Sequence, residues 1–362
     1  MIKVGEERQY TFNKKLRWLR QYTKESNSID WDASDYEFLN YEFETGPRKV
    51  YKNFNLSIFV DDYCNANCRF CVAQLRYQNR NLMYQKKHIE DRDKYLYRLE
   101  RILTAVRPLN PSISLTGGEP TLSPNFVDIL KLVDKYGFRK RTITTNGSAL
   151  LKTVDNSTVV EQLIKYHFNH LNISKVSSDD FLNSQIMNYS IDSPYCFFNN
   201  SDLKDVLDIT NKSDLHHRIS CLLLKESVNS VDKIKRYIDD LQECGANNFI
   251  FRELMDYDKS AVNTDKMQYC DANKIKLYDI WQQFDDDPLF TPWLNILGYY
   301  YYVEIYKYNH CTVASESADM NIQYREKAAN PNIVFEMVFH NNGNLCGSWV
   351  DNEDILSEYK GV

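Results

Sequence analysis

The chain has 362 residues, which suits one large α/β domain with extensions rather than a single minimal domain. Its net charge of −6 and the lack of a long Lys/Arg run exclude the basic footprint of a nucleic-acid-binding protein. No apolar run approaches the roughly 20 residues that cross a bilayer, and the charged start lacks the apolar stretch of a signal peptide, so we expect a cytoplasmic protein without a membrane partner.

The chain divides by pattern into three regions. Residues 1–50 are polar and aromatic and form an expected N-terminal extension that ends near Gly46-Pro47. Residues 51–258 alternate short apolar runs with helix-length amphipathic segments, as parallel strands joined by helices do. The predicted strands cover 56–60, 112–116, 141–145, 170–174, 219–224 and 248–252. The predicted helices cover 85–106, 124–136, 158–166, 202–210 and 231–244.

Residues 259–362 break this rhythm and predict a strand-containing C-terminal cap or substrate region. A helix is predicted over 269–284 and strands over 298–308, 333–340 and 345–350. The Asn-Gly pair at 342–343 favours a tight hairpin between the last two strands. The alternating region predicts either an open sheet or a barrel, and in both folds ligands gather beyond the carboxyl ends of the strands.

Three cysteines, Cys64, Cys68 and Cys71, follow the first predicted strand with the spacing C-x3-C-x2-C. In a reducing compartment such a cluster indicates a metal site or catalysis rather than disulfides. An iron–sulfur cubane normally takes four cysteines, so a cubane held by three keeps one iron open for another ligand. Structural zinc is the alternative, but it needs four ligands, and no Cys or His lies nearby in the sequence to complete the set.

Informative residues also follow the next predicted strands, at the same expected edge of the sheet. Gly117-Gly118-Glu119-Pro120 follows the second strand, and Asn146-Gly147 follows the third. Two glycines let a backbone approach a ligand closely, and Glu119 offers an acceptor to a cationic group such as an α-amino group. An ordinary turn between strand and helix is the alternative for the Gly-Gly pair alone.

Taken together, these motifs resemble the radical S-adenosylmethionine (radical SAM) superfamily over residues 51–258. The resemblance implies a partial (β/α)6 TIM-like barrel of parallel strands. It implies that Cys64, Cys68 and Cys71 ligate three irons of an oxygen-sensitive 4Fe–4S cluster, with S-adenosylmethionine chelating the fourth iron. It also implies residues that contact S-adenosylmethionine: Phe70 and Leu254 near the adenine, Gly117, Gly118 and Glu119 at the methionyl amine, and Thr145, Asn146 and Ser174 at the ribose or methionine.

The resemblance further implies reductive cleavage of S-adenosylmethionine to a 5′-deoxyadenosyl radical, which abstracts hydrogen from a substrate. A thiolate-held cluster reaches a potential of about −400 mV in ferredoxin-type centres, and reducing a sulfonium needs a strong reductant. We therefore expect an external low-potential electron donor of the flavodoxin or ferredoxin type. The expected substrate is a small molecule or a nucleotide-like metabolite.

A finer similarity concerns residues 251–256, which look like the sixth-strand segment of the GTP cyclase of molybdenum-cofactor synthesis. It makes Arg252 a candidate substrate contact, with a salt-bridged strand end as the alternative. The C-terminal region lacks the paired cysteines of that cyclase's second cluster, which argues against GTP cyclisation. Glu304 is a further candidate substrate contact, with a solvated strand face as the alternative.

Two other functions stay open from the sequence. The first is a radical SAM enzyme that modifies a peptide, although the extension before residue 51 looks too short and irregular for a complete peptide-recognition domain. The second is a non-catalytic metal-binding barrel. The intact cysteine, Gly-Gly-Glu-Pro and Thr-Asn-Gly motifs favour an enzyme, because a degenerate relative is expected to have lost at least one of them.

Overall fold

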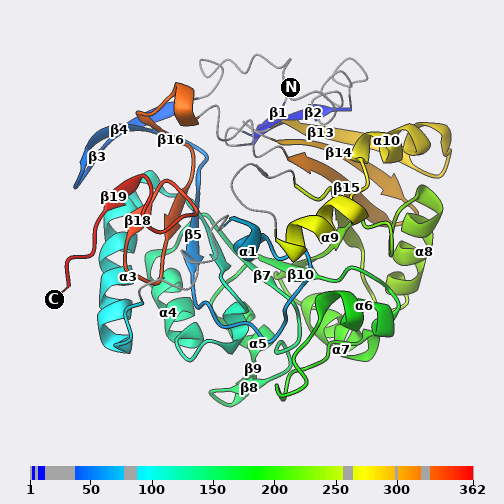
Figure 1. The fold of residues 1–362 in the computed structure, drawn as a ribbon, viewed down its shortest axis with the longest axis horizontal. Helices are drawn as coiled ribbons and strands as arrows, with labels where there is room; N and C mark the ends of the chain where they lie inside the picture. The colour runs from blue at the N-terminus through cyan, green and yellow to red at the C-terminus, as the bar shows by residue number, and fades with distance from the viewer. Residues whose placement is uncertain are drawn as a thin grey trace.

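The computed structural model describes residues 2–4, 7–12, 37–76, 88–255, 264–297, 301–318 and 327–361. Six parallel strands follow one another in chain order and form its centre (Figure 1). They are β5 (Asn55–Phe59), β6 (Ser112–Thr116), β7 (Lys140–Thr145), β10 (His170–Ser174), β11 (His216–Leu222) and β12 (Asn248–Arg252). All six strands expected from the sequence are confirmed, with ends displaced by a few residues at most.

Helices connect these strands and cover one side of the curved sheet (Figure 1). They are α3 (Arg92–Val106), α4 (Phe126–Tyr136), α5 (Val159–Lys165), α6 (Asp180–Met187), α7 (Asn200–Thr210) and α8 (Val231–Gln242). Local signals set their ends: the Asp91 side chain caps α3, and Gly137 ends α4 with a φ of 57°. The expected partial (β/α)6 arrangement is confirmed, and α6 is an additional helix. A small hairpin of β8 (Thr153–Val154) and β9 (Ser157–Thr158) precedes α5.

Further strands, most of them C-terminal, extend this sheet at both of its edges. Beyond β12 the order continues through β15 (Cys311–Ala318), β14 (Tyr301–Tyr308), β13 (Thr291–Leu297), β2 (Glu7–Thr11) and β1 (Ile2–Val4). Beyond β5 it continues through β17 (Met337–Phe339), β18 (Leu345–Cys346) and β19 (Ile355–Ser357). The hairpin predicted at the Asn-Gly turn is confirmed as β17–β18. The predicted helix over 269–284 is split into α9 (Asp265–Asn273) and α10 (Leu277–Asp286).

The N-terminal extension pairs with these C-terminal strands. Strand β2 lies beside β13, while β3 (Phe38–Phe43) and β4 (Gly46–Tyr51) form a hairpin that pairs with β16 (Ile333–Val334). The two regions therefore share sheets, although they stand at opposite ends of the sequence. The predicted boundary at residue 258 lies outside the described residues, and the division into three domains stays a prediction.

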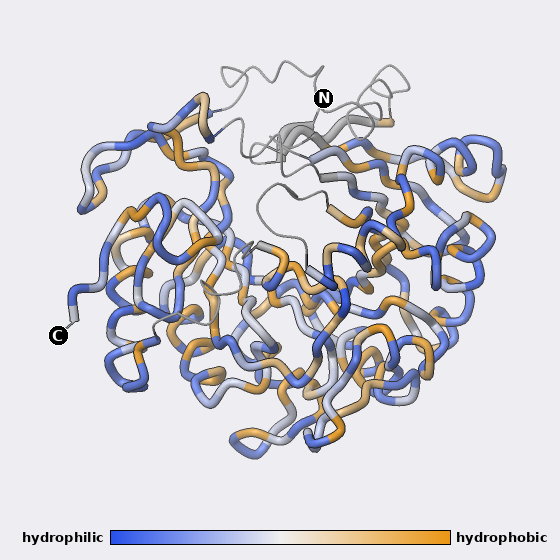
Figure 2. Tube along the Cα trace, in the orientation of Figure 1, coloured by the Kyte–Doolittle hydropathy of each residue, from blue (hydrophilic) through white to orange (hydrophobic). Residues whose placement is uncertain are grey.

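The central strands alternate apolar and polar residues along the chain, and their register places each kind on one face. The apolar set packs under the helices and is fully buried; it includes Leu56, Ile58, Ile113, Leu115, Ile143, Leu171, Ile173, Ile219, Phe249 and Phe251. Figure 2 shows hydrophobic and hydrophilic residues interspersed along these strands. The side chains on the opposite, concave face are mostly Ser, Thr, Asn and Arg.

Among the helices in the described part of the chain, none is both long and apolar enough to cross a membrane.

Candidate functional site

The three cysteines lie on the segment between β5 and the short helix α1 (Val72–Arg76). All three thiols are partly buried, and none forms a disulfide. Cys71 begins the helical turn, because its carbonyl accepts hydrogen bonds from the backbone N–H groups of Gln74 and Leu75. The segment therefore leaves the end of β5, exposes three sulfur atoms and turns directly into a helix.

Burial dominates the acid–base behaviour of these thiols. Together with the nearby Glu119 and Cys71 it raises the pKa of Cys64 to about 12, although hydrogen bonds from the Ala66 N–H and the Asn146 side chain oppose the rise. Burial also raises the pKa of Cys68 well above its ordinary value, followed by the effect of Cys71 and Cys64. These raised pKa values favour the protonated thiols in the free protein.

Gly117 and Gly118 bring the segment after β6 against the residues that precede Cys64. The Gly118 N–H donates to the Asp61 carbonyl at 2.7 Å, and the Glu119 N–H donates to the Tyr63 carbonyl at 2.8 Å. A Cβ atom on Gly118 would lie 2.1 Å from the Tyr63 carbonyl oxygen, and Gly117 has a φ of +143°. Only glycine fits this approach, so the predicted close backbone contact exists, although its partner here is the protein itself.

Glu119 is 1% exposed and links two strand ends. Its Oε1 accepts hydrogen bonds from the hydroxyls of Thr121 and Thr145, both at 2.6 Å, and from the Thr121 N–H at 3.2 Å. Its Oε2 accepts one from the Asn146 N–H at 2.7 Å. Burial raises the pKa of the carboxyl group, and these four hydrogen bonds oppose that rise. Contact between Glu119 and a cationic ligand stays a prediction.

Asn146 continues this network to the cysteine segment. Its Nδ2 donates to the Asn65 Oδ1 at 2.8 Å, and its Oδ1 accepts from the Ser148 hydroxyl at 2.7 Å. Asn65, 1% exposed, donates in turn to Ser148 Oγ at 2.9 Å and to the Tyr195 carbonyl. The side chains of Thr145 and Asn146 thus hold the site together.

Residues 188–199, between α6 and α7, pack on the cysteine segment and were not identified from the sequence. The Asn67 N–H donates to the Asn188 carbonyl at 2.9 Å, and the Tyr189 hydroxyl donates to the Asn146 carbonyl at 3.0 Å. Just before this segment, Met187 accepts a hydrogen bond from the Cys68 thiol at 3.8 Å between the sulfur atoms. The cysteines are therefore supported from β7 and from α6 as well as from β6.

Lys266 on α9 is a second residue that sequence reasoning missed. Its ammonium group donates to the Asn67 Oδ1 at 2.9 Å and to the Cys68 carbonyl oxygen. The positive charge lowers the pKa of the Cys68 thiol, against the larger effect of burial. No spacing in the sequence pointed to this contact, because α9 follows the cysteines by about two hundred residues.

Phe70 and Leu254 share an apolar cluster beside Cys68. Phe70 is 9% exposed and Leu254 4%, and Cys68 packs against the same group of side chains. The cluster also contains Leu75, Val176, Ile186, Met187, Tyr189, Leu224, Met267 and Cys270. The structure therefore brings the two residues expected near the adenine to one apolar region next to the cysteines.

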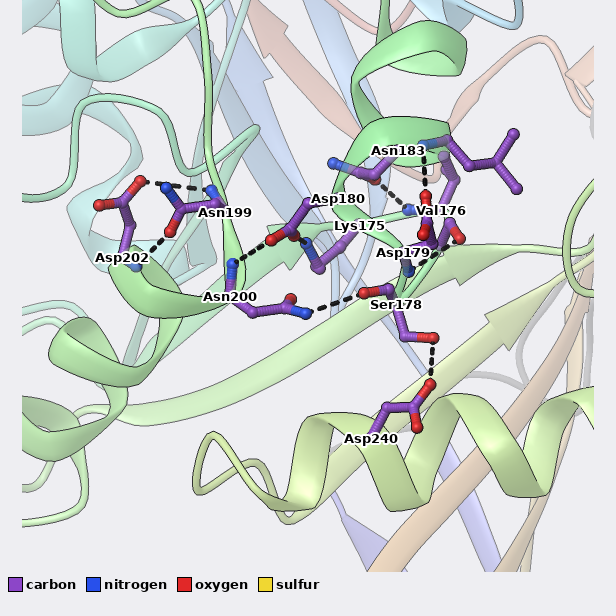
Figure 3. Close-up of polar contacts among 12 residues, drawn as sticks. Lys175, Val176, Ser178, Asp179, Asp180, Asn183, Asn199, Asn200, Asp202 and Asp240 are labelled. Carbon is purple, nitrogen blue, oxygen red and sulfur yellow. Dashed lines mark hydrogen bonds and ion pairs between the residues drawn. The ribbon is translucent and has the colours of Figure 1, made fainter.

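Ser174 ends β10 on the concave face and is partly exposed. The residues after it are fixed, as Figure 3 shows. Lys175, fully buried, donates from Nζ to the Asp180 Oδ1 at 2.8 Å, and the Asp180 Oδ2 accepts from the Asn200 N–H at 3.0 Å. The Val176 N–H donates to the Asn183 Oδ1 at 2.9 Å. These contacts hold the segment after β10 against α6 and α7.

The two candidate substrate residues lie on opposite faces of the sheet. Arg252 is on the concave face and pairs with Glu316, with 3.3 Å between Arg252 Nε and Glu316 Oε1. Glu304 is fully buried on the other face, under α10, where it accepts hydrogen bonds from the Tyr302 and Tyr306 hydroxyls. The structure thus places Arg252 near the site and does not bring Glu304 there. Glu304 is not on a solvated face either.

Comparison with known proteins identifies relatives that match only part of this chain and only part of their own length. The "GTP 3',8-cyclase" of Marinobacter nauticus is 32% identical over 120 residues, which are 33% of this chain and 32% of that protein. The "Probable GTP 3',8-cyclase" of Saccharolobus solfataricus is 31% identical over 100 residues, 26% of this chain and 28% of that protein. The chain therefore matches about a third or less of the length of these relatives.

Solved structures with a similar arrangement include Streptococcus suis SuiB, with 18% identity and a TM-score of 0.48 over 82% of this chain and 60% of that chain. The radical S-adenosylmethionine methyltransferase TsrM of Kitasatospora setae has 11% identity and a TM-score of 0.40 over 55% of this chain and 36% of that chain. The family model described as "Radical SAM superfamily" matches residues 58–238, which is half of the sequence. The chain belongs to the radical SAM superfamily.

Proposed function

We propose that this chain is a radical SAM enzyme in which Cys64, Cys68 and Cys71 ligate three irons of a 4Fe–4S cluster. Members of the superfamily use such a cluster together with S-adenosylmethionine. The observation that carries the proposal is the contact between the Gly117–Gly118 backbone and residues 61–63, directly before Cys64. It sets the amine-binding segment expected after β6 beside the three thiols.

Among the described residues no three His, Cys, Asp or Glu side chains form a ready metal-binding group, so the chemistry and the spacing of the three cysteines support the cluster. Three thiols on one segment, each partly buried, are soft ligands suited to iron–sulfur binding, and the fourth iron is left for the amine and carboxylate of S-adenosylmethionine. When bound, the cluster and S-adenosylmethionine supply a 5′-deoxyadenosyl radical that removes hydrogen from a substrate. The raised thiol pKa values imply that cluster binding releases protons from Cys64 and Cys68.

The other residues of the site bind and orient. Phe70 and Leu254 offer an apolar surface for the adenine, and Ser174 offers a hydroxyl to the ribose or methionine at the end of β10. In this proposal Glu119, Thr145 and Asn146 act together, because their hydrogen bonds fix the segments that meet S-adenosylmethionine. Burial of the site excludes water from the reacting groups.

The substrate in this proposal is a small molecule or a nucleotide-like metabolite, and Arg252 is its candidate contact. The polar concave face supports a polar substrate, since Ser, Thr, Asn and Arg side chains line it. The alternative is a peptide substrate. An external low-potential donor of the flavodoxin or ferredoxin type supplies the electron, in a reducing cytoplasm.

Anaerobic reconstitution of the chain with iron and sulfide tests the proposal. We expect about four irons per chain, brown colour, and 5′-deoxyadenosine formation with dithionite and S-adenosylmethionine. Cys68→Ala removes one ligand and should abolish both the cluster and the cleavage. Cys244→Ala, a buried cysteine at the end of α8 away from the site, is the matched control and should keep both.

Three outcomes would contradict the proposal. Zinc in place of the cluster would favour the structural-metal alternative, and a cluster without cleavage of S-adenosylmethionine would favour a non-catalytic barrel. Retention of the cluster in Cys68→Ala would refute the ligand assignment.

A further inference from the structure

Helix α9 lies against the cysteine segment (residues 60–71), although it comes from the C-terminal part of the chain (Figure 1). It follows residues 58–238, which the family model matches, so the family match assigns it no role. Its buried residues Met267 and Cys270 belong to the same apolar cluster as Phe70. Helix α9 therefore covers part of the segment that carries the three cysteines.

Both ends of α9 are fixed. The Thr264 side chain caps its first turn, and the Asn273 carbonyl in its last turn accepts a hydrogen bond from the Lys225 N–H at 3.0 Å. Between these ends, the Tyr269 ring centre lies 5.6 Å from the guanidinium carbon of Arg69 on the cysteine segment. These contacts set the position of the helix relative to the cysteines.

Lys266, in the first turn of α9, is partly buried and reaches the backbone of the cysteine segment. Its ammonium group donates to the Asn67 Oδ1 at 2.9 Å and to the Cys68 carbonyl oxygen. The Asn67 carbonyl oxygen lies 3.5 Å from the same nitrogen. An ammonium group has three N–H donors, and these three acceptors, an amide and two carbonyls, are neutral groups. A positive charge is therefore held within one residue of an expected iron ligand.

A charge in this position acts on the redox equilibrium of a cluster held by the cysteines. Reduction adds one negative charge, and the net charge and hydrogen bonds around a cluster are among the features that set its potential. A nearby cation stabilises the reduced form by Coulomb attraction, and solvent screens a partly buried charge less than an exposed one. The fixed ammonium group of Lys266 is therefore placed to make reduction easier.

We propose that Lys266 is a positioning residue that holds a positive charge against Asn67 and Cys68 and thereby raises the reduction potential of the cluster. This inference rests on the proposed function, because it concerns the cluster that the three cysteines hold there. The step it assists is the transfer of one electron from the external low-potential donor to that cluster. A higher potential lets a less strongly reducing donor complete this transfer.

Potentiometric titration of the reconstituted full chain measures the effect, with the reduced cluster followed by electron paramagnetic resonance in the absence of S-adenosylmethionine. Lys266→Met removes the charge and the hydrogen-bond donor. We expect the equilibrium constant for one-electron reduction to fall about tenfold, which is a fall of about 59 mV in potential. Lys266→Arg keeps the charge and should restore a potential close to that of the wild type.

Lys266→Gln separates the charge from the hydrogen bonds. Its side-chain amide keeps a donor for the Asn67 and Cys68 oxygens but carries no charge, so it should retain about four irons and lower the potential as Lys266→Met does. This variant keeps the test decisive even if Lys266→Met takes up no cluster. Lys276→Met is the matched control, because it removes the charge of an exposed lysine at the start of α10, and it should be reduced at the wild-type potential.

The inference is overturned if Lys266→Met and Lys266→Gln are reduced at the wild-type potential, or if Lys276→Met lowers the potential equally. Loss of the cluster from both Lys266 variants would assign the residue a purely structural role and would overturn the inference as well. Formation of 5′-deoxyadenosine by the wild type with dithionite reports separately on the proposed function. Wild-type cleavage of S-adenosylmethionine together with an unchanged potential in both variants would refute this inference alone.

Discussion

Gly118 is the residue at which the segment after β6 touches the backbone before the cysteines. A methyl group there would lie 2.1 Å from the Tyr63 carbonyl oxygen, so Gly118→Ala must displace one of the two segments. We expect a loss of about 3 kcal/mol of stability from this overpacking, and a larger effect on cluster content, because Cys64 follows Tyr63 directly. Iron content after reconstitution and the free energy of unfolding measure the two effects.

Gly137→Ala is the matched control for that substitution. Gly137 has a φ of +57° but open space around its Cβ position, so alanine costs only about 1 kcal/mol of backbone strain. The control should bind a full cluster. Equal cluster content in the two variants would show that the close approach at Gly118 does not position the cysteines.

At the same scale, the sequence predicted the residues that belong to local motifs and missed those brought in by the fold. Cys64, Cys68 and Cys71 and the Gly-Gly pair were identified because their spacing is local. Lys266 and Tyr189 reach the site through tertiary contacts that no spacing encodes. Glu304 was wrongly expected on a face open to substrate or solvent. Its strand was predicted from 298–308, but the sequence of a strand does not tell which of its two faces a helix such as α10 will cover.

The ion pair between Lys175 and Asp180 holds the connection from β10 to α6, as Figure 3 shows. The Lys175 side chain is fully buried, whereas the side chain of Asp180 is 31% exposed. Asp180→Asn leaves a buried ammonium without its anion and should cost about 3 kcal/mol. Lys175→Met should cost less, because water can reach the remaining carboxylate. Chemical denaturation of both variants measures this asymmetry.

The double variant Lys175→Met/Asp180→Asn should recover part of the loss, since no buried charge remains. Lys52→Met serves as the control, because its pair with Glu37 is about half exposed on both sides and such surface pairs contribute at most about 1 kcal/mol. Equal losses for the two single variants would contradict the role assigned to burial.

The strands of the central sheet were predictable because each combines an apolar alternation with a turn or helix signal at its ends. Strands β13 and β15 were not predicted. Their segments, Thr291–Leu297 and Cys311–Ala318, contain Pro, Asn, Ser and Glu, which interrupt the apolar alternation of a strand. Pairing with neighbouring strands holds these segments extended despite that composition. The alternation Ser-Ile-Ser-Leu-Thr over 112–116 shows that one face of this strand is polar. The sequence alone does not tell that the helices cover the apolar face and leave the polar face on the concave side.

For the whole molecule, buried histidine makes stability depend on pH. His217 is 4% exposed, and its Nε2 accepts the Asn247 N–H at 3.3 Å, so the ring is neutral with its proton on Nδ1 beside Thr210. Burial lowers the pKa of His217 to about 4 from an ordinary 6.5. As the pH falls, His217 is protonated in the unfolded chain before it is protonated in the folded protein. The free energy of unfolding is therefore highest above pH 6.5 and decreases as the pH drops from about 6.5 toward 4.

We expect a loss of about 2 kcal/mol from His217 across that window. Denaturant unfolding at pH 7.5 and pH 4.5 measures it, and His217→Gln should flatten the profile by that amount, at some cost in stability at neutral pH. His310→Gln, at an exposed turn position, should leave the profile unchanged. An unaltered profile in His217→Gln would assign the pH dependence to other groups.

The strands that extend the sheet at both edges indicate that the six central strands and their helices do not form an independent folding unit. In the whole chain β5 pairs with β17 and β12 pairs with β15, so a fragment of residues 51–258 would expose both edges of its sheet (Figure 1). Unpaired edges of parallel strands recruit other chains, and the fragment also loses α10, whose Trp281 and Phe284 are buried against the sheet. We therefore expect the fragment to aggregate or to unfold without cooperativity, as size-exclusion chromatography and thermal melting would show.

A chain that lacks only residues 360–362 keeps every strand and should melt as the full chain does. Cooperative melting of the 51–258 fragment together with cluster binding would mean that the C-terminal strands serve the substrate rather than the fold.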